Sequence, residues 1–236
     1  MSPTSGLEFF RRVRRGFETL VRRYQIRFCL AADIGRGTGL FACYLNRCWG
    51  VPVYAVDKSP EMLNAARRRC PGSDICFLQQ DIRELCLPER VHLVTANFDT
   101  LNHLVCLRDL HRAFRRVAEN LRPGGHFYFD IITPYEPLGG LRTYRRTHCT
   151  TQHSMEQRVR WEPRQALIRI HVLRRQAGCA WPTVEQHTER AYGPADIGRG
   201  LLEAGFVIRG VHDEGTLAVA DRCPPRIIVI AQKKCS

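Results

Sequence analysis

The stretch Phe28–Leu40, FCLAADIGRGTGL, is the part of the sequence that best predicts the fold. An apolar run containing Asp33 ends at Ile34, glycines follow at positions 35, 37 and 39, and a helical pattern begins at Leu40. Glycine lets the backbone turn sharply and approach a ligand closely, and a helix N-terminus offers unpaired N–H groups. The stretch therefore predicts a strand, a glycine turn and a helix at a nucleotide-type ligand site.

Two features define that site further. The dinucleotide pattern G-x-G-x-x-G fails, because its third glycine would fall at Leu40. An apolar segment at 52–57 ends in Asp57, about 20 residues beyond the turn, where a ribose-binding acid is expected. The same acid also precedes Ser59-Pro60, a helix start signal. We favour the ribose role for Asp57, and the capping role is compatible with it.

Apolar strand patterns and helical patterns continue to alternate along the chain. The expected helices are 60–69 and 107–121, and the expected strands are 75–80, 92–97 and 126–132. Asp81 follows the third strand, where a carboxylate can accept from an adenine amino group while Ile82 lies against the ring. This alternation predicts an α/β fold with a doubly wound parallel sheet and a ligand at the carboxyl ends of the strands.

The pattern changes after residue 133. Short alternating runs at 156–161, 166–173 and 184–192, separated by turn signals, predict a small antiparallel β insertion. A helix at 194–204 and strands at 206–211 and 226–231 complete the expected elements. The expected division is a leading helix in 1–27, a core of 28–134 and 193–236, and the insertion at 135–192.

Composition narrows the classes of function. The net charge is +13, but only three of the 36 basic residues are lysines. Because an arginine bias can reflect genome composition, we do not take the charge as a sign of nucleic-acid binding, and an anionic substrate stays open. No apolar run has the length of a membrane span. The arginine-rich first thirty residues resemble an organellar targeting segment, but an amphipathic helix at 7–24 is the simpler reading, and we expect a cytoplasmic protein.

The eleven cysteines are scattered and form no C-x-x-C pair. Cys29, Cys76 and Cys106 lie in apolar runs, where we interpret them as small core residues. No metal site is indicated, and a reducing compartment is favoured.

Taken together, the motifs resemble those of class I S-adenosylmethionine-dependent methyltransferases. They are the glycine turn 33–39, Asp57, Asp81-Ile82, and the segments 97–102, 121–125 and 129–134, in the family's order. The insertion and the Phe-Asp-x-x-Thr-Pro ending resemble the small-molecule branch. That branch includes glycine N-methyltransferase-like enzymes and the N,N-dimethyltransferases of nucleotide-linked amino sugars. The resemblance implies a Rossmann-like sheet of order 3-2-1-4-5-7-6 with strand seven antiparallel.

The resemblance also implies a cofactor, S-adenosyl-L-methionine, and roles for residues. The backbone of Gly35, Gly37 and Gly39 would receive its methionine portion, Asp57 its ribose and Asp81 its adenine. The segment Ala96, Asn97 and Phe98 would pass under the sulfonium. The remaining predicted cofactor-binding residues are Asp33, Thr38, Lys58, Met62 and Ile82. Two positions depart from the family pattern. Between the first two glycines, where the family usually has a small residue, this chain has Arg36. Tyr24 lies too close to the turn to be the tyrosine that covers the cofactor in the family.

Methyl transfer requires an aligned nucleophile, a dry site and, where needed, a base. We predict His103 as the base because it follows strand four, with Tyr135 as a second candidate. His153, His171 and His187 of the insertion are candidates to line the pocket, although each also fits a structural role. The insertion's arginines are either phosphate or carboxylate ligands or a solvated face: Arg142, Arg145, Arg146, Arg158 and Arg160.

Three functions remain in competition. The first is methyl transfer to N or O of a small polar metabolite, neutral or anionic. The second is RNA methylation. Two observations argue against it: residues 97–100 do not form an Asn-Pro-Pro-aromatic loop, and no appended RNA-binding module is visible in the sequence. The third is a non-catalytic cofactor-binding subunit. We expect no membrane partner, and the insertion could join copies of the chain into an oligomer.

Overall fold

The computed structural model describes residues 6–35, 38–135, 140–149, 153–176, 181–220 and 224–235. Within these ranges, the centre of the molecule is a seven-stranded sheet in which one strand runs antiparallel to the others. From edge to edge the strands are β3 (Ile75–Gln79), β2 (Val53–Asp57), β1 (Ala31–Ile34), β4 (Val91–Ala96), β5 (Leu121–Ile132), β11 (Arg226–Lys233) and β10 (Phe206–Asp213).

The strands β3, β2, β1, β4 and β5 are parallel, and β11 is antiparallel to both of its neighbours. The structure therefore confirms the predicted α/β class and the predicted strand order 3-2-1-4-5-7-6. In that order, strand six is β10 and strand seven is β11. Because the carboxyl ends of the parallel strands share one edge, that edge is where the segments after β1, β2, β3 and β4 converge.

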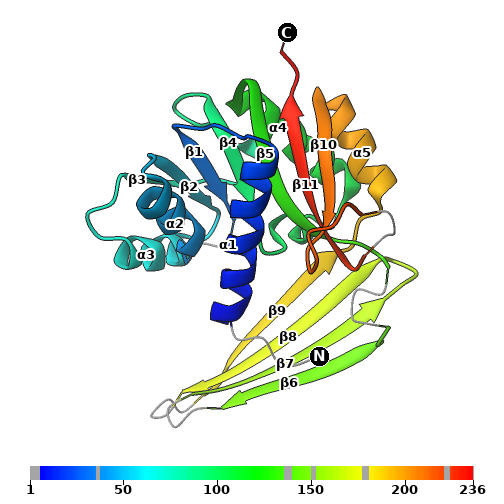
Figure 1. Cartoon of the computed structure of the whole chain (residues 1–236). Helices are drawn as coiled ribbons and strands as arrows, with labels where there is room; N and C mark the ends of the chain where they lie inside the picture. The colour runs from blue at the N-terminus through cyan, green and yellow to red at the C-terminus, as the bar shows by residue number, and fades with distance from the viewer. Residues whose placement is uncertain are drawn as a thin grey trace.

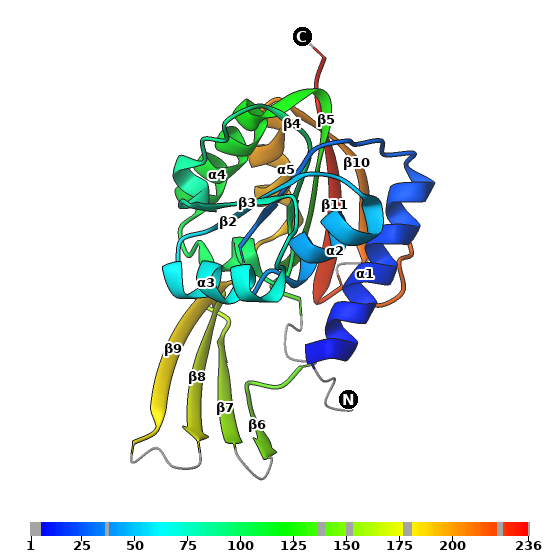
Figure 2. The ribbon, with the colours of Figure 1, turned by 90° about the vertical axis from the view of Figure 1, so that its left-hand side faces the viewer.

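Helices cover both faces of this sheet. The helices α4 (Leu107–Asn120) and α5 (Pro194–Glu203) lie on one face, and α1 (Gly6–Arg23) and α2 (Leu40–Trp49) lie on the other, as Figure 2 shows. The helix α3 (Pro60–Arg69) follows β2 and packs beside β2 and β3. The central strands β1 and β4 are thus buried on both faces of the sheet, as their apolar residues predict.

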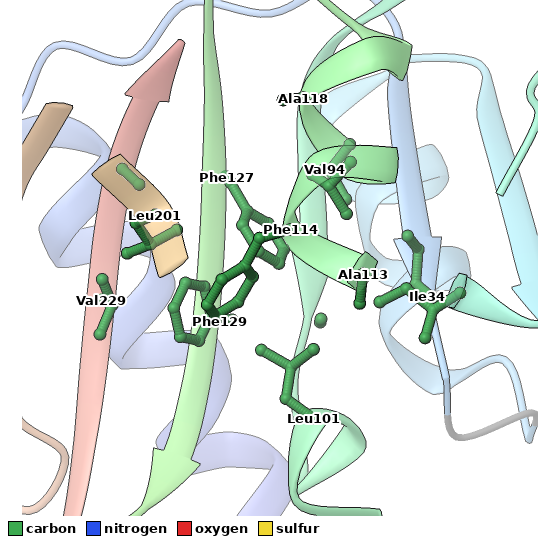
Figure 3. Packing of buried hydrophobic residues seen from close by; sticks show 14 of the residues in the cluster. Ile34, Val94, Leu101, Ala113, Phe114, Ala118, Phe127, Phe129, Leu201 and Val229 are labelled. Carbon is green, nitrogen blue, oxygen red and sulfur yellow. The ribbon is translucent and has the colours of Figure 1, made fainter. Parts of the chain in front are cut away.

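The larger core cluster is built on aromatic rings from β5. Phe114 of α4 lies against Phe129, with ring centroids 5.7 Å apart, and Phe127 and Phe129 are 4.6 Å apart (Figure 3). Leu201 of α5 and Val229 of β11 close the same cluster (Figure 3). All five side chains are buried, and burying a side chain of this size contributes about 1.5–3 kcal/mol.

On the opposite face, Phe17 anchors α1 to the rest of the molecule. Its side chain is fully buried, with its ring 5.2 Å from that of Phe41 in α2 and 5.1 Å from that of Tyr128 in β5. The leading helix is therefore part of the core cluster rather than an appended segment, and it packs against α2, the helix that follows the glycine turn.

A second, four-stranded sheet projects from the carboxyl-end edge (Figures 1 and 2). Its antiparallel strands, in order, are β6 (Thr143–Cys149), β7 (His153–Glu162), β8 (Leu167–Gln176) and β9 (Thr183–Arg190). A small cluster at its base joins Trp161 and Ile168 to Ile132 at the end of β5. The predicted β insertion is thus present.

Some sequence-based predictions of elements were wrong. The strand β6 was not expected, and β5 begins at Leu121 rather than at residue 126. The helix α4 ends at Asn120, whose side chain donates to Leu85 O and accepts from Leu87 N. Two short 3₁₀ helices also appear, η1 (Ile82–Glu84) and η2 (Thr100–His103).

The cysteine interpretation needs correction. Cys29, Cys76 and Cys106 are exposed and are not core residues. Among the residues that the structure describes, the buried cysteines are Cys43 of α2 and Cys70 at the end of α3, and they form a disulfide. Within the described residues no helix is both long enough and apolar enough to cross a membrane.

Candidate functional site

The glycine turn after β1 packs tightly against two neighbouring segments. Gly35 has φ +76° and donates its N–H to Val56 O at 2.9 Å. A Cβ at Gly35 would overlap the side chain of Thr100, and a Cβ at Gly39 (φ +70°) would lie 2.7 Å from that of Ala66. Both positions therefore require glycine. Gly37 and Arg36 lie outside the described residues, and Thr38 follows them directly.

Asp33 braces β1 against β4 from within the sheet. Its side chain is buried and accepts a hydrogen bond of 2.7 Å from Thr95 Oγ1. Burial raises the pKa of Asp33 to about 7, although the hydrogen bonds from Thr95 and from the Ala42 backbone lower it, and the nearby charge of Asp57 raises it further. Asp33 thus has a structural role, and its role in binding the cofactor stays a prediction.

Asp57 lies at the carboxyl end of β2, next to the turn. Its Oδ1 accepts from Ser59 N at 2.8 Å, and Ser59 Oγ in turn caps α3 by accepting from Met62 N at 3.2 Å. The alternative role of Asp57 in starting α3 is therefore present, alongside a position that suits a ribose ligand. Lys58 accepts at its backbone from Gln79, and Met62 is 45% exposed in the first turn of α3.

Asp81, after β3, is engaged by Arg83. Arg83 donates from Nε and Nη2 to the two carboxylate oxygens at 3.0 and 2.7 Å, and its backbone N–H donates as well. These bonds lower the pKa of Asp81. Arg83 also reaches Asp109 of α4 at 3.0 Å. An adenine amino group at Asp81 would share the carboxylate with Arg83, while Ile82 lies buried beside it.

The end of β4 holds a buried amide that lacks partners. Ala96 is buried, and Asn97 is only 1% exposed, yet neither its Nδ2 nor its Oδ1 has a hydrogen-bond partner among the described residues. An unsatisfied buried amide costs about 1–3 kcal/mol, so it needs an explanation such as a ligand. Phe98 and Asp99 follow with φ of +61° and +66°. Non-glycine residues in this region are uncommon and cluster at functional sites.

The first turns of α1 cover this strained segment. The ring of Phe9 lies edge-on to that of Phe98 at 5.4 Å, and the ring of Phe10 is stacked 6.5 Å from Phe98. Tyr24 is at the other end of α1, where its hydroxyl bonds His212 Nε2 at 2.8 Å. Tyr24 is therefore remote from these rings, and it is Phe9 and Phe10 that lie beside Phe98.

An ion cluster that was not predicted lies next to these rings. Arg226 Nη1 of β11 donates to Asp130 Oδ2 of β5 at 2.6 Å and also to Asp99, and its guanidinium lies 5.6 Å from the Phe9 ring. Burial raises the pKa of Asp130 to about 6 against the opposing effect of Arg226. The only sequence signal was an acid inside the apolar run FYFDII.

His103, the predicted base, ends η2 and meets the insertion. Its Nε2 is 3.8 Å from Glu189 Oε1 of β9, and its ring centroid is 6.2 Å from that of His187. The His103 side chain is about half exposed, whereas Glu189 is buried. Tyr135, the second candidate, is 47% exposed beyond the end of β5. Glu189 was not identified from the sequence.

The other predicted histidines of the insertion do not join this group. His171 pairs with Gln186 and Arg158, one register position from His187, so it lies on the opposite face of the small sheet. The side chain of His153 lies outside the described ones.

Most of the candidate arginines lie on that opposite face and have acidic partners. Arg145 and Arg158 share Glu156, at 2.7 and 2.5 Å. Arg160 and Arg169 share Glu162, at 3.9 and 3.0 Å. The four arginines and Glu156 line a hollow of about 740 Å³ on the face of the small sheet opposite His187. Arg146 is on the same face as Val172, and Arg142 precedes β6 and accepts at its backbone from Trp161 N.

The edge as a whole fits a cationic sulfonium nucleoside. It joins a glycine turn without Cβ atoms, a carboxylate at the end of β2 and the unpartnered amide of Asn97 at the end of β4. Carboxylates suit ribose hydroxyls and a cationic centre, and a buried amide suits a polar ligand. Among the described residues there is no group of three metal-ligating side chains.

Comparisons with known proteins point the same way. Residues 31–125 match a family described as "Methyltransferase domain". Demethylmenaquinone methyltransferase of Chlorobaculum tepidum is 34% identical over 106 residues, which are 44% of this chain and 40% of that protein. A dTDP-3-amino-3,4,6-trideoxy-alpha-D-glucopyranose N,N-dimethyltransferase of Streptomyces venezuelae is 30% identical over 93 residues, 39% of this chain and 38% of that protein.

Likeness in structure extends over nearly the whole chain. An S-adenosylmethionine-dependent methyltransferase from Clostridium acetobutylicum superposes with a TM-score of 0.82 at 23% identity, covering 95% of this chain and 92% of that one. The matches to the curated relatives, by contrast, span about two fifths of those proteins. The comparisons confirm the resemblance to class I methyltransferases that was drawn from the sequence.

Proposed function

We propose that this chain, which has the class I methyltransferase fold, is an S-adenosylmethionine-dependent enzyme that methylates a nitrogen of a small polar metabolite. The observation that carries the proposal is the meeting, at one sheet edge, of the glycine turn, Asp57 and the unpartnered amide of Asn97. The matched domain at 31–125 contains all three.

Each part of the cofactor has residues to hold it. The backbone at Gly35, Thr38 and Gly39 would hold the amino-acid end, and Asp57 the ribose. The adenine would lie beside Ile82 and Asp81, the sulfonium above Ala96, Asn97 and Phe98, with Lys58 and Met62 at the rim. When bound, this cofactor supplies an activated methyl group, so the protein needs to align the acceptor and exclude water.

Charge favours an amine as the acceptor. Near η2 lie the carboxylates of Asp99, Asp130 and Glu189, and the guanidinium of Arg226 bonds the first two. Arg146 of β6 is a second cation on this side of the insertion, so among these five groups the carboxylates outnumber the guanidinium groups by one. Such surroundings attract a protonated amine and disfavour a phosphate. His103 would take the amine's proton, which frees the lone pair for attack. The N,N-dimethyltransferase named above is a partial relative whose name describes nitrogen methylation.

Calorimetry with S-adenosylmethionine tests the cofactor site. Asp57→Ala should weaken binding by about 1–3 kcal/mol, because charge-assisted hydrogen bonds are lost. Asp74→Ala is the matched control, since Asp74 is exposed ahead of β3 and should leave affinity unchanged. Equal affinity in wild type and Asp57→Ala would remove Asp57 from the site, and no binding by the wild type would favour a non-catalytic role.

The acceptor is tested separately. Incubation with labelled S-adenosylmethionine and matched panels of small amines and alcohols should label amines. Labelling of alcohols alone would contradict the nitrogen assignment. Labelling of RNA, with binding that weakens steeply as salt rises, would favour the RNA methyltransferase reading.

A further inference from the structure

We propose that Glu189 is a positioning residue that orients His103 and sets which of its two ring nitrogens acts as the base. The inference rests on the proposed function, since it assigns His103 a proton to remove. It goes further by pairing His103 with a residue of the insertion, 86 positions later in the chain. The observation behind it is the approach of Glu189 Oε1 to His103 Nε2 at 3.8 Å.

Glu189 is an acid in a place that favours apolar residues. It faces the same side of the small sheet as its register partner Ile168, which is 2% exposed, and Glu189 itself is 6% exposed. Burying a carboxylate costs free energy unless it is paired with a positive or donating group. A protonated or N–H-donating imidazole of His103 is such a group.

The residues on either side of His103 are hydrogen-bonded to the segment that carries Glu189 and to the end of β5. Asn102, just before His103, donates to Arg190 O at 2.7 Å and accepts from Ile132 N at 3.0 Å. Leu104, just after His103, accepts at its backbone from the hydroxyl of Tyr192. The residues that flank His103 are thus bonded to Arg190, the neighbour of Glu189, and to Tyr192, two residues further on. This frame fixes His103 and Glu189 relative to each other.

The tautomer follows from the geometry. If Nε2–H points at Glu189, then Nδ1 carries the lone pair and is the nitrogen that accepts the proton of the methyl acceptor. The present distance is that of an ion pair, and such pairs shorten when a substrate fills the site. In the protonated state, the imidazolium is stabilised by the adjacent carboxylate.

Other titratable and charged groups surround this pair, and they come from β9, from β6 and from the loop before η2. His187 of β9 lies beside His103 and bonds Glu185 at 3.3 Å. Tyr144 of β6 is close enough to Glu189 and Asp99 for their charges to raise its pKa, which burial raises most, while Arg146 lowers it. The pH dependence of His103 therefore reflects Glu189, His187, Tyr144, Arg146 and Asp99 together, and only a change at Glu189 isolates its part.

The test compares Glu189→Gln with the wild type in two measurements. The first follows the histidine ring signals by NMR as pH varies, with the His103 signal identified by its loss in His103→Gln. The midpoint of the His103 titration should fall by about one pH unit, because the imidazolium loses an opposite charge nearby. The second is the pH–rate profile with an amine acceptor, whose acidic limb should move to lower pH while kcat falls about tenfold.

Two control variants separate the outcomes. Glu156→Gln, on the opposite face of the insertion, should leave the titration and kcat unchanged. Glu189→Asp keeps the charge and should retain the wild-type acidic limb of the pH–rate profile with an intermediate kcat. If Glu189→Gln does not fold, Glu189→Asp is the variant to compare with the wild type. An unchanged His103 midpoint in Glu189→Gln would overturn the proposal. Absence of turnover in the wild type would defeat the proposed function, while the NMR titration would still test the pair.

Discussion

Two buried asparagines near the carboxyl-end edge differ in what they bond. Asn102 makes hydrogen bonds to Arg190 O, Ile132 O and Ile132 N, whereas the amide of Asn97 has no partner within the described residues. A satisfied buried amide stabilises the fold, and an unsatisfied one costs free energy that a ligand can recover. The contrast predicts opposite consequences for the same substitution.

Asn97→Ala should therefore weaken the binding of S-adenosylmethionine without lowering the free energy of unfolding. Asn102→Ala is the matched control, and it should lower the free energy of unfolding by about 1–3 kcal/mol, since it leaves backbone groups unpaired. Calorimetry and urea unfolding measure the two effects. Full cofactor affinity in Asn97→Ala would show that the amide does not face the ligand.

Asp33 makes stability depend on pH. Its pKa is about 7 in the folded protein, against an ordinary value of 3.8. An acid whose pKa is raised by folding stabilises the fold below the unfolded pKa, and that contribution is lost as pH rises through the folded pKa. For Asp33 the loss falls between about pH 4 and pH 7, and about 4 kcal/mol is its upper bound.

Asp33→Asn should abolish this dependence, because asparagine can still accept from Thr95 and carries no charge. The variant should gain stability over the wild type as pH is raised from 5 to 8, measured by urea unfolding at each pH. A stability difference that stays constant over this range would mean that Asp33 is ionised throughout, or protonated throughout.

At the scale of elements, three segments far apart in the sequence are joined by one cation. Arg226 of β11 bonds Asp130 of β5 and Asp99 of the loop after β4. Removing one partner of a buried ion pair leaves a charge uncompensated and costs about 3–5 kcal/mol. The cluster therefore holds the strained turn at Phe98 and Asp99 in place.

Arg226→Met should lower the free energy of unfolding by about 3–5 kcal/mol at pH 8. At pH 5 the cost should shrink, since protonation of Asp130, whose pKa is about 6, removes one of the two uncompensated charges. Arg174→Met, which breaks an exposed pair with Glu185, should change stability by less than about 1 kcal/mol. A cost for Arg226→Met that does not depend on pH would contradict this account.

The elements differ in how well they could be predicted from their own residues. The strands β1, β2 and β4 were predictable because they are short apolar runs between helical patterns. The strand β6 was not, since its sequence TYRRTHC offers no apolar alternation, and its pairing with β7 supplies what its own residues lack. The glycine turn and the position of Asp57 at the end of β2 could be predicted because both depend on local spacing. Glu189 and Arg226 could not, because each acts on a partner at least 86 residues away.

At the scale of the whole molecule, α1 connects the core to the site. Phe17 anchors the helix against the sheet, and Phe9, two turns earlier, lies over Phe98 and between the guanidinium groups of Arg12 and Arg226, at 4.9 and 5.6 Å. The N-terminal turns of α1 and the insertion both lie at the carboxyl-end edge (Figure 1). We therefore expect a ligand bound beside Phe98 to lie next to the first turns of α1.

Phe9→Ala should speed the dissociation of S-adenosylmethionine about tenfold, because loss of the ring removes the cover over Phe98 and its two cation–π contacts. Phe28→Ala is the matched control: Phe28 is also half-buried and packs on Phe17 and Trp49, away from the rings beside Phe98. That variant should lower the melting temperature and leave dissociation unchanged, as measured by stopped-flow fluorescence. Equal dissociation rates in Phe9→Ala and the wild type would mean that α1 supports the sheet but does not close the site.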